Sequence, residues 1–198
     1  MGYEKYVKRV LDVVFAIVGL LILAVPMLII SIFIKATSQG PVLFKQLRYG
    51  KHSKSFVMYK FRSMALGTPE KANQEFSDMD EYITCVGSFL RKTSLDELPQ
   101  LWNVLKGDMS FVGPRPLAES DIEVVRLRQQ NGGDLVRPGI TGWAQVNGRN
   151  KISNQEKAAY DAEYATNLTF LLEFKIIWLT LRAVALREGI NHNDEKSN

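Results

Sequence analysis

The stretch RKTSLDELPQ, residues 91–100, places two adjacent carboxylates, Asp96 and Glu97, at the start of a predicted helix. A helix N-terminus carries a partial positive charge, which keeps a nearby carboxylate ionised. An ionised carboxylate can act as a nucleophile, and its neighbour can hold a divalent cation. The same residues also fit a structural role, because Ser94 as N-cap and Glu97 three residues later make a capping box. Local sequence leaves both interpretations open.

Attack on a diphosphate by a carboxylate brings like charges together, so cations must surround such a site. At an effective dielectric constant of about 20, each pair of unit charges about 4 Å apart costs about 4 kcal/mol. Three of the candidate arginines lie in loops that Pro and Gly make rigid, where a guanidinium fork can be held against phosphate. The candidate phosphate-binding residues are Lys60, Arg62, Arg91, Arg115, Arg137 and Arg149.

The chain contains none of the GxxxxGK[ST], GxGxxG, HExxH, GxSxG or CxxC patterns. Common nucleotide, zinc-protease, hydrolase and redox sites are therefore excluded at the level of motif. One cysteine, Cys85, and two histidines, His52 and His192, also argue against a zinc site or a Cys/His nucleophile. We predict Cys85 to be a small buried thiol. A single cysteine fits a reducing, cytosol-facing location.

Several long stretches together carry a resemblance to a known family. They are the basic N-terminus with its Pro-broken apolar run, YKFRSM at 59–64, SLDELPQLWNVLKGDMSFVGPRP at 94–116, and VRPGITGWAQVNGRN at 136–150. The chain resembles the bacterial sugar transferases, the monotopic phosphoglycosyl transferases, from about residue 3 to residue 189. Over that length the resemblance favours the chemical interpretation of the carboxylate pair.

The resemblance implies a reaction as well as a site. A sugar 1-phosphate would pass from a UDP-sugar to a polyprenyl (undecaprenyl) phosphate, with UMP released and Mg²⁺ required. By motif match, Asp96 would form a covalent aspartyl phosphosugar intermediate, Glu97 would be associated with the metal, and Arg115 would contact phosphate. The implied location is the cytoplasmic face of the bacterial inner membrane. The implied role is the first membrane step in assembling a capsule, exopolysaccharide, O-antigen or glycoprotein glycan.

Further assignments are hypotheses from residue type alone. The loop at 139–149 is a candidate uridine site with Trp143, Gln145 and Asn147 as base contacts, although Trp143 packed inside the fold is the simpler interpretation. Asp161 is a weaker candidate for a metal ligand. No nucleic-acid partner is predicted, a homo-oligomer is compatible with the sequence, and no residue specifies the sugar. Two rival functions remain open: a membrane-tethered scaffold, and a hydrolase that cleaves diphosphate donors with water.

The elements that must position these residues begin with an apolar run. Between Asp12 and Lys35 lie 22 residues without a charge, which as a helix would extend about 33 Å. Both flanks are basic, and the positive-inside tendency therefore draws both to the cytoplasmic side. This favours a re-entrant segment that bends at Val25–Pro26 over a straight span. The family usually has Ser-Pro at this break, and Val25 supplies no hydroxyl for a freed carbonyl.

Charge is distributed unevenly along the chain. The net charge is +4, yet residues 1–69 contain ten Lys and Arg against two acids, and residues 35–62 contain seven basic residues and no acid. The first third thus carries +8 and the remainder −4. Such a basic block suits anionic lipid headgroups or phosphates.

The remaining pattern predicts a helix-rich α+β fold, with a membrane-associated re-entrant helix over residues 1–36 and a small catalytic domain over 37–198. With 198 residues, 46% of them hydrophobic, one compact unit is expected. We predict a β-hairpin over 42–49 and 56–64, a surface loop or a short helix over 66–80, and a loop with one short strand over 131–149. Helices are predicted over 81–92, 94–106, 117–130, 153–165 and 168–188. The last helix either lies in the membrane interface or packs in the soluble core.

Overall fold

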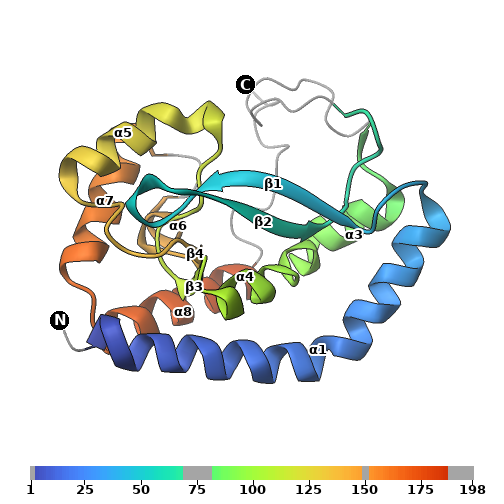
Figure 1. Cartoon of the computed structure of the whole chain (residues 1–198), viewed down its shortest axis with the longest axis horizontal. Helices are drawn as coiled ribbons and strands as arrows, with labels where there is room; N and C mark the ends of the chain where they lie inside the picture. The colour runs from blue at the N-terminus through green and yellow to red at the C-terminus, as the bar shows by residue number, and fades with distance from the viewer. Residues whose placement is uncertain (1–2, 69–81, 149–151, 187–198) are drawn as a thin grey trace.

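A long N-terminal helix and two small sheets organise the chain (Figure 1). The computed structural model describes residues 3–68, 82–148 and 152–186. Over these residues the architecture is helix-rich α+β, as predicted. The segment 66–80, expected to be a surface loop or a short helix, falls mostly outside the described residues.

Helix α1, Arg9–Thr37, follows a short π-helix, Tyr3–Lys8. Figure 1 shows that α1 changes direction along its length and that the rest of the protein lies in the angle between its two parts. Pro26 lies inside α1, where it lacks the N–H that a helix requires and its ring crowds the preceding turn. Among the helices described, only the one over Tyr6–Thr37 is long and apolar enough to cross a membrane.

One side of α1 packs on the rest of the chain. Ala16 joins a core cluster with Met58 and Val104, and Ile34 joins another with Phe61. The opposite side of α1 is exposed and apolar: Leu21, Ile22, Val25 and Leu28 are each more than 60% exposed. The helix is thus attached to the catalytic part along its length while a face of it stays uncovered by protein.

The first turn of α1 is fixed by buried polar contacts. Lys8 Nζ donates to the Val112 carbonyl at 3.1 Å and to Glu173. Asp12 Oδ1 accepts from Ser110 Oγ at 3.0 Å and from the Phe111 N–H at 3.2 Å. These contacts join α1 to strand β3, Ser110–Val112, and to helix α8, Phe170–Ala185, which are far away in sequence.

The predicted hairpin is confirmed. Strands β1, Leu43–Tyr49, and β2, Ser55–Phe61, pair antiparallel around a short 3₁₀ turn, Lys51–Ser53. Asn103 anchors the hairpin to helix α4, Gln100–Lys106. Its amide donates to the Val57 carbonyl at 2.7 Å, and its Oδ1 accepts from the Tyr59 N–H at 3.0 Å. Asn103 is completely buried, so these bonds also satisfy its polar atoms.

Helices α3, Cys85–Lys92, and α4, Gln100–Lys106, flank the carboxylate pair. Thr84 caps α3 by accepting from the Gly87 N–H at 2.9 Å, and so the helix begins later than predicted. Gly107 ends α4 with φ +95°, as the sequence indicated. The prediction for Cys85 is wrong: its position in the first turn of α3 faces outward and the thiol is exposed.

A pair of short parallel strands lies at the centre. Strands β3, Ser110–Val112, and β4, Gly139–Thr141, are followed by α6, Trp143–Asn147, and the predictions missed β3 and α6. Three glycines allow the close approach here. A Cβ on Gly139 would lie 2.1 Å from the Gly113 nitrogen, and one on Gly142 would lie 2.1 Å from the Gly113 oxygen.

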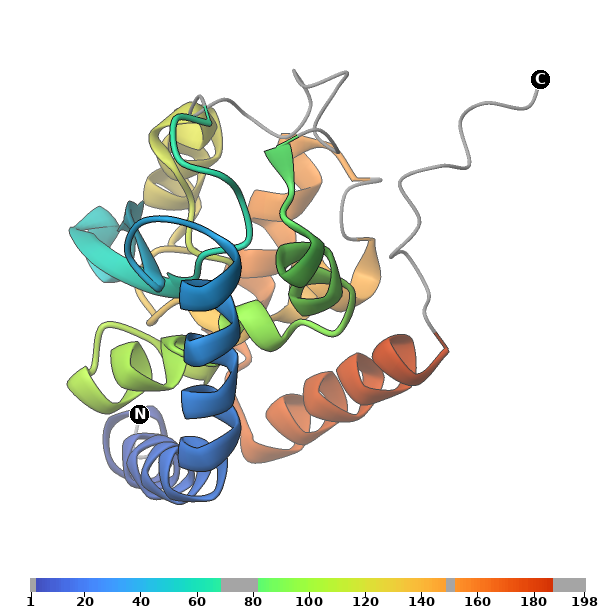
Figure 2. The same cartoon turned by 90° about the vertical axis from the view of Figure 1, so that its right-hand side faces the viewer.

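The remaining helices are α5, Ile122–Asn131, which follows a 3₁₀ turn at Glu119–Asp121, then α7, Asn154–Thr166, and α8, Phe170–Ala185. Helix α8 is not enclosed by a core. It buries Glu173 and Ile176 and leaves most of its large apolar side chains exposed, namely Phe170, Leu171, Phe174, Ile177, Trp178, Leu181 and Val184. In both views α8 lies at the same side of the molecule as the first part of α1 (Figure 1, Figure 2).

We predict that Gly139→Ala lowers the free energy of unfolding by about 3 kcal/mol or more, because backbone atoms cannot move aside as side chains do. The matched control is Gly67→Ala. A Cβ at Gly67 meets nothing within 4 Å, and so the control carries only the cost of a left-handed φ, about 1 kcal/mol. Denaturant unfolding in detergent measures both. Equal effects of the two substitutions would refute the role of close backbone approach.

Candidate active site

Asp96 and Glu97 lie in a 3₁₀ turn, Leu95–Glu97, between α3 and α4. The capping-box interpretation is wrong. Ser94 has φ +56° and makes no side-chain cap bond, and α4 begins only at Gln100. Because a left-handed conformation costs a non-glycine residue about 1–2 kcal/mol, the surrounding packing must hold this turn in place.

The packing that holds the turn comes from its apolar residues. Leu95 and Leu98 contact the core cluster formed by Ile34, Phe61 and Leu90. These belong to α1, β2 and α3, so three elements clamp the turn from one side. The two carboxylates between the leucines are left at the edge of that cluster.

Lys60 of β2 provides the closest counter-charge. Its Nζ lies 2.6 Å from Glu97 Oε1, and both side chains are about a quarter exposed or less. A hollow beside this ion pair is lined by residues from the hairpin, α4 and the segments after β3 and before α6: Arg48, Met58, Lys60, Glu97, Gln100, Arg115, Pro116, Gly139 and Ile140. Two predicted phosphate-binding residues, Lys60 and Arg115, are thus brought together with Glu97.

Glu97 is held in its charged form. Burial is the largest single influence and opposes ionisation, but the charge and hydrogen bond of Lys60, the charge of Arg115 and a hydrogen bond from Gln100 together outweigh it. The pKa of Glu97 therefore lies below its usual range. A carboxylate that stays ionised suits cation binding.

Asp96 is in the opposite situation. Burial raises its pKa above the ordinary value, and the neighbouring Glu97 charge adds to the rise, while Lys60 and Arg91 pull it back. Two adjacent carboxylates with pKa values displaced in opposite directions are typical of sites in which each has its own role. Partial removal of water also leaves the Asp96 carboxylate less shielded from an electrophile.

Other predicted cations lie elsewhere. Arg62 is buried and donates to the carbonyls of Gln39 at 2.6 Å and Ser38 at 2.9 Å, so its guanidinium is bound to the segment that follows α1. Arg137 Nε donates to the Gly107 carbonyl at 3.0 Å, at the C-terminal end of α4. Neither lines the hollow. Arg149 lies outside the described residues.

The three predicted uridine contacts lie in different environments. Trp143 packs edge-on against Tyr160, with ring centroids 6.5 Å apart, and Lys175 Nζ lies 5.0 Å from its ring centroid. This is the packed arrangement rather than an open stacking surface. Gln145 Nε2 donates to the carbonyl of Ile140, a residue of the hollow, at 3.1 Å. Asn147 is exposed and donates to its own helix at Trp143.

Asp161 lies in a buried ion pair with Arg128, with Arg128 Nη2 2.6 Å from its Oδ2. Two nitrogens of Arg128 contact that oxygen, and the placement gives no support to a metal-binding role for Asp161. Across residues 3–68, 82–148 and 152–186, no group of three or more His, Cys, Asp or Glu side chains could hold a metal ion.

Sequence reasoning missed two residues of the hollow. Gln100 is 3% exposed, sits at the first position of α4 and bonds to Glu97. Arg48 lies on β1 and lines the hollow beside Lys60. A signal for Gln100 existed, since it follows the carboxylate pair by one helical turn. Arg48 could be recognised only as part of the basic block.

A carboxylate pair among cations, next to a helix apolar enough to enter a bilayer, fits the class of membrane-associated enzymes that act on phosphate groups. A family model described as bacterial sugar transferase matches residues 3–187. The chain belongs to the bacterial sugar transferase family.

Three relatives illustrate the match. An uncharacterized sugar transferase, EpsL of Bacillus subtilis (strain 168), is 43% identical over 94% of this chain and 91% of its own length. UDP-glucose:undecaprenyl-phosphate glucose-1-phosphate transferase of Escherichia coli (strain K12) is 41% identical over 91% of this chain. Undecaprenyl-phosphate galactose phosphotransferase of Salmonella typhimurium is 37% identical over 94% of it. The chain spans about two fifths of the length of these last two relatives, 40% and 42%.

We predict that Lys60→Met moves the acidic limb of the pH–rate profile to higher pH and lowers kcat/KM by about 10²-fold. Lys60 lowers the pKa of both carboxylates, so without it both protonate at a higher pH and the charged forms are lost sooner. Lys92→Met is the matched control, because Lys92 is an exposed lysine of α3 outside the set that acts on Asp96. An unchanged acidic limb in Lys60→Met would contradict the assignment.

Proposed function

We propose that this protein transfers a sugar 1-phosphate from a UDP-sugar to a membrane polyprenyl phosphate such as undecaprenyl phosphate, releasing UMP. The observation that carries the proposal is the Asp96–Glu97 pair, with Lys60 bonded to Glu97 and Arg115 beside it. The named activities of the Escherichia coli and Salmonella relatives, transfer to undecaprenyl phosphate, support the choice of acceptor.

The reaction proceeds in two displacements at one phosphorus atom. An Asp96 carboxylate oxygen attacks the sugar-bearing phosphorus of the donor, and the bond to the bridging oxygen breaks, so that UMP leaves with the electron pair. An aspartyl phosphosugar remains. An oxygen of the polyprenyl phosphate then attacks the same phosphorus, the acyl phosphate bond breaks, and Asp96 is regenerated as a carboxylate. Donor and acceptor bind in turn, which gives ping-pong kinetics.

The surrounding cations make the first attack electrostatically feasible. Lys60 and Arg115 face the hollow, where they can neutralise the diphosphate that a carboxylate must approach. Mg²⁺, held by Glu97 together with donor phosphates, would supply further charge neutralisation when bound. Gln145 is the strongest candidate for a nucleotide contact among the three named from sequence, because it bonds to a residue of the hollow.

The membrane attachment follows from the uncovered apolar faces of α1 and α8. We infer that α1 enters the cytoplasmic face of the inner membrane and returns to it, with α8 lying in the interface beside it. The bend in α1 and the basic residues on both flanks favour this topology. The acceptor phosphate would then reach the site from the same surface.

Intact-protein mass spectrometry tests the chemistry. The chain is incubated with Mg²⁺ and a panel of UDP-sugars in the absence of polyprenyl phosphate. We expect a mass increment of one sugar phosphate, its loss in Asp96→Asn, and its retention in the control Asp108→Asn, whose carboxylate pairs with Lys106. The donor that gives the increment identifies the sugar.

Other outcomes favour the rival functions. UMP release only with acceptor and no adduct would indicate direct transfer. Sugar phosphate release into water without acceptor would indicate a hydrolase. No adduct and no UMP from any donor, with Asp96→Asn changing stability only slightly, would favour a membrane-tethered scaffold.

Fluorescence quenching by brominated lipids tests the membrane placement. We predict that Trp178, which is 62% exposed on α8, is quenched in liposomes, because an interfacial indole lies at the depth of the bromines. Two variants are compared, one that keeps only Trp178 and one that keeps only Trp143. Trp143, packed against Tyr160, is the control and should keep its emission. Equal quenching of both residues would contradict the placement of α8.

A further inference from the structure

The buried pair of Arg128 and Asp161 has no place in the chemistry described so far. Arg128 of α5 is 7% exposed and Asp161 of α7 is 1% exposed. Arg128 Nε donates to Asp161 Oδ2 at 2.8 Å, and Nη2 lies 2.6 Å from the same oxygen. Two contacts from one edge of the guanidinium to one oxygen fix the plane of the Arg128 side chain.

The remaining edge of Arg128 reaches the candidate active site. Its Nη1 donates to the main-chain carbonyl of Arg115 at 2.9 Å. Arg115 lines the hollow with Lys60 and Glu97. One buried guanidinium therefore joins α7 to the backbone of a residue that faces the proposed donor phosphates.

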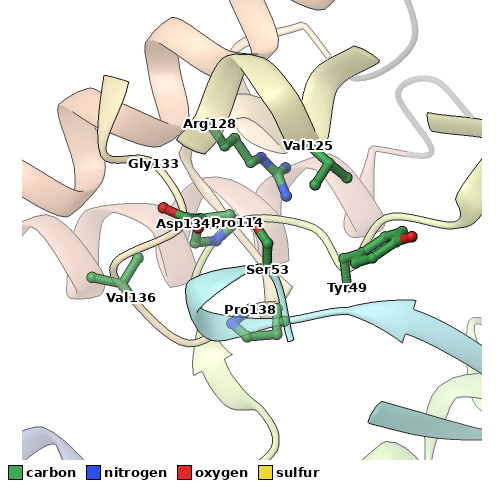
Figure 3. A pocket seen from close by; sticks show the side chains of 10 residues that line it. Tyr49, Ser53, Pro114, Val125, Arg128, Gly133, Asp134, Val136 and Pro138 are labelled. Carbon is green, nitrogen blue, oxygen red and sulfur yellow. Dashed lines mark hydrogen bonds between the residues drawn. The ribbon is translucent and has the colours of Figure 1, made fainter. Parts of the chain in front are cut away.

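On either side of Arg115, backbone bonds hold the segment: the Pro114 carbonyl accepts from the Gly139 N–H at 2.9 Å and the Leu117 carbonyl from the Tyr49 N–H at 2.8 Å. The Arg115 carbonyl itself is held by Arg128. Arg115 is flanked by Pro114 and Pro116, neither of which has an N–H to donate. Behind it lies a small cavity lined in part by Pro114, Val125, Arg128 and Pro138 (Figure 3), with room for about one water molecule. Figure 3 shows the Arg128 side chain extending from α5 toward this cavity. Close packing from behind is thus incomplete, and the Arg128 bond is a specific anchor.

We propose that Asp161 and Arg128 are positioning residues that orient Arg115 toward the phosphates of the nucleotide donor. Asp161 fixes the guanidinium plane of Arg128, and Arg128 fixes the Arg115 carbonyl and hence the direction of its side chain. Neither residue touches substrate. The inference rests on the proposed function for the identity of the donor.

A double-mutant cycle tests the proposal, with UDP as the probe ligand and a UDP-sugar as substrate. We expect Asp161→Asn to raise the donor KM and the Kd for UDP by about tenfold, the scale of one misplaced charged contact, with the Mg²⁺ activation constant unchanged. In an Arg115→Ala background, the same Asp161→Asn change should have almost no further effect, because its route to the substrate is gone. Additive effects would overturn the proposal. A changed Mg²⁺ constant would instead make Asp161 a metal ligand.

A second variant keeps the test valid if Asp161→Asn fails to fold. Removing one member of a buried pair leaves an uncompensated charge, whereas replacing both with apolar residues is often tolerated. Arg128→Met with Asp161→Leu should therefore fold and still show the raised Kd for UDP. Normal UDP affinity in this folded variant would show that the pair is only structural.

The matched control is Glu173→Gln, which alters the other buried ionic cluster, around Lys8. It should lower Tm and leave the Kd for UDP unchanged. UDP titration by calorimetry requires no turnover, so the cycle remains readable even if no sugar phosphate is transferred and the proposed function fails. Absence of UDP binding to the unaltered protein at millimolar concentration would overturn the inference itself.

Discussion

Two adjacent carboxylates in a half-buried turn repel each other, and they stay ionised only if nearby cations offset that repulsion and the loss of water. Lys60 makes the decisive contact, 2.6 Å from Glu97, and its charge also opposes the rise in the pKa of Asp96 that burial causes. Like charges a few ångströms apart in a partly dry site repel by several kcal/mol. The site therefore depends on bringing β2 to the turn between α3 and α4, and the packing around the turn serves that end.

Several separate contacts meet this requirement. Asn103 ties α4 to β2 through the Val57 carbonyl and the Tyr59 N–H, so the strand that carries Lys60 and the helix that follows Glu97 are joined directly. The close approach of Gly113 and Gly139 lets the parallel strands end next to the hollow. Each contact joins segments that are far apart in sequence, and none of the residues involved takes part in the proposed reaction.

The long apolar helix α1 is connected to the same site. Ile34 of α1 belongs to the cluster on which Leu95 and Leu98 rest. At the other end of α1, Lys8 and Asp12 are bonded to α8 and β3. A change in how α1 sits in a bilayer would therefore be felt at the carboxylate turn. This coupling suits the proposed reaction, in which the acceptor would lie in the membrane and the donor would come from water.

The sequence by itself determined the local elements and the chemical candidates. The hairpin, the apolar helix with Pro26 and the helix end at Gly107 follow from short-range patterns, because periodicity, turn residues and left-handed φ are local properties. The tertiary structure alone decided which cations meet the carboxylates. Sequence ranked Lys60, Arg62 and Arg137 alike, but Arg62 is bound at the end of α1 and Arg137 at the end of α4. The tertiary structure also places Ser94 in a left-handed conformation rather than in a helix cap, and it pairs Asp161 with Arg128. Such outcomes depend on distances between segments far apart in the chain, and no pattern within one segment contains them.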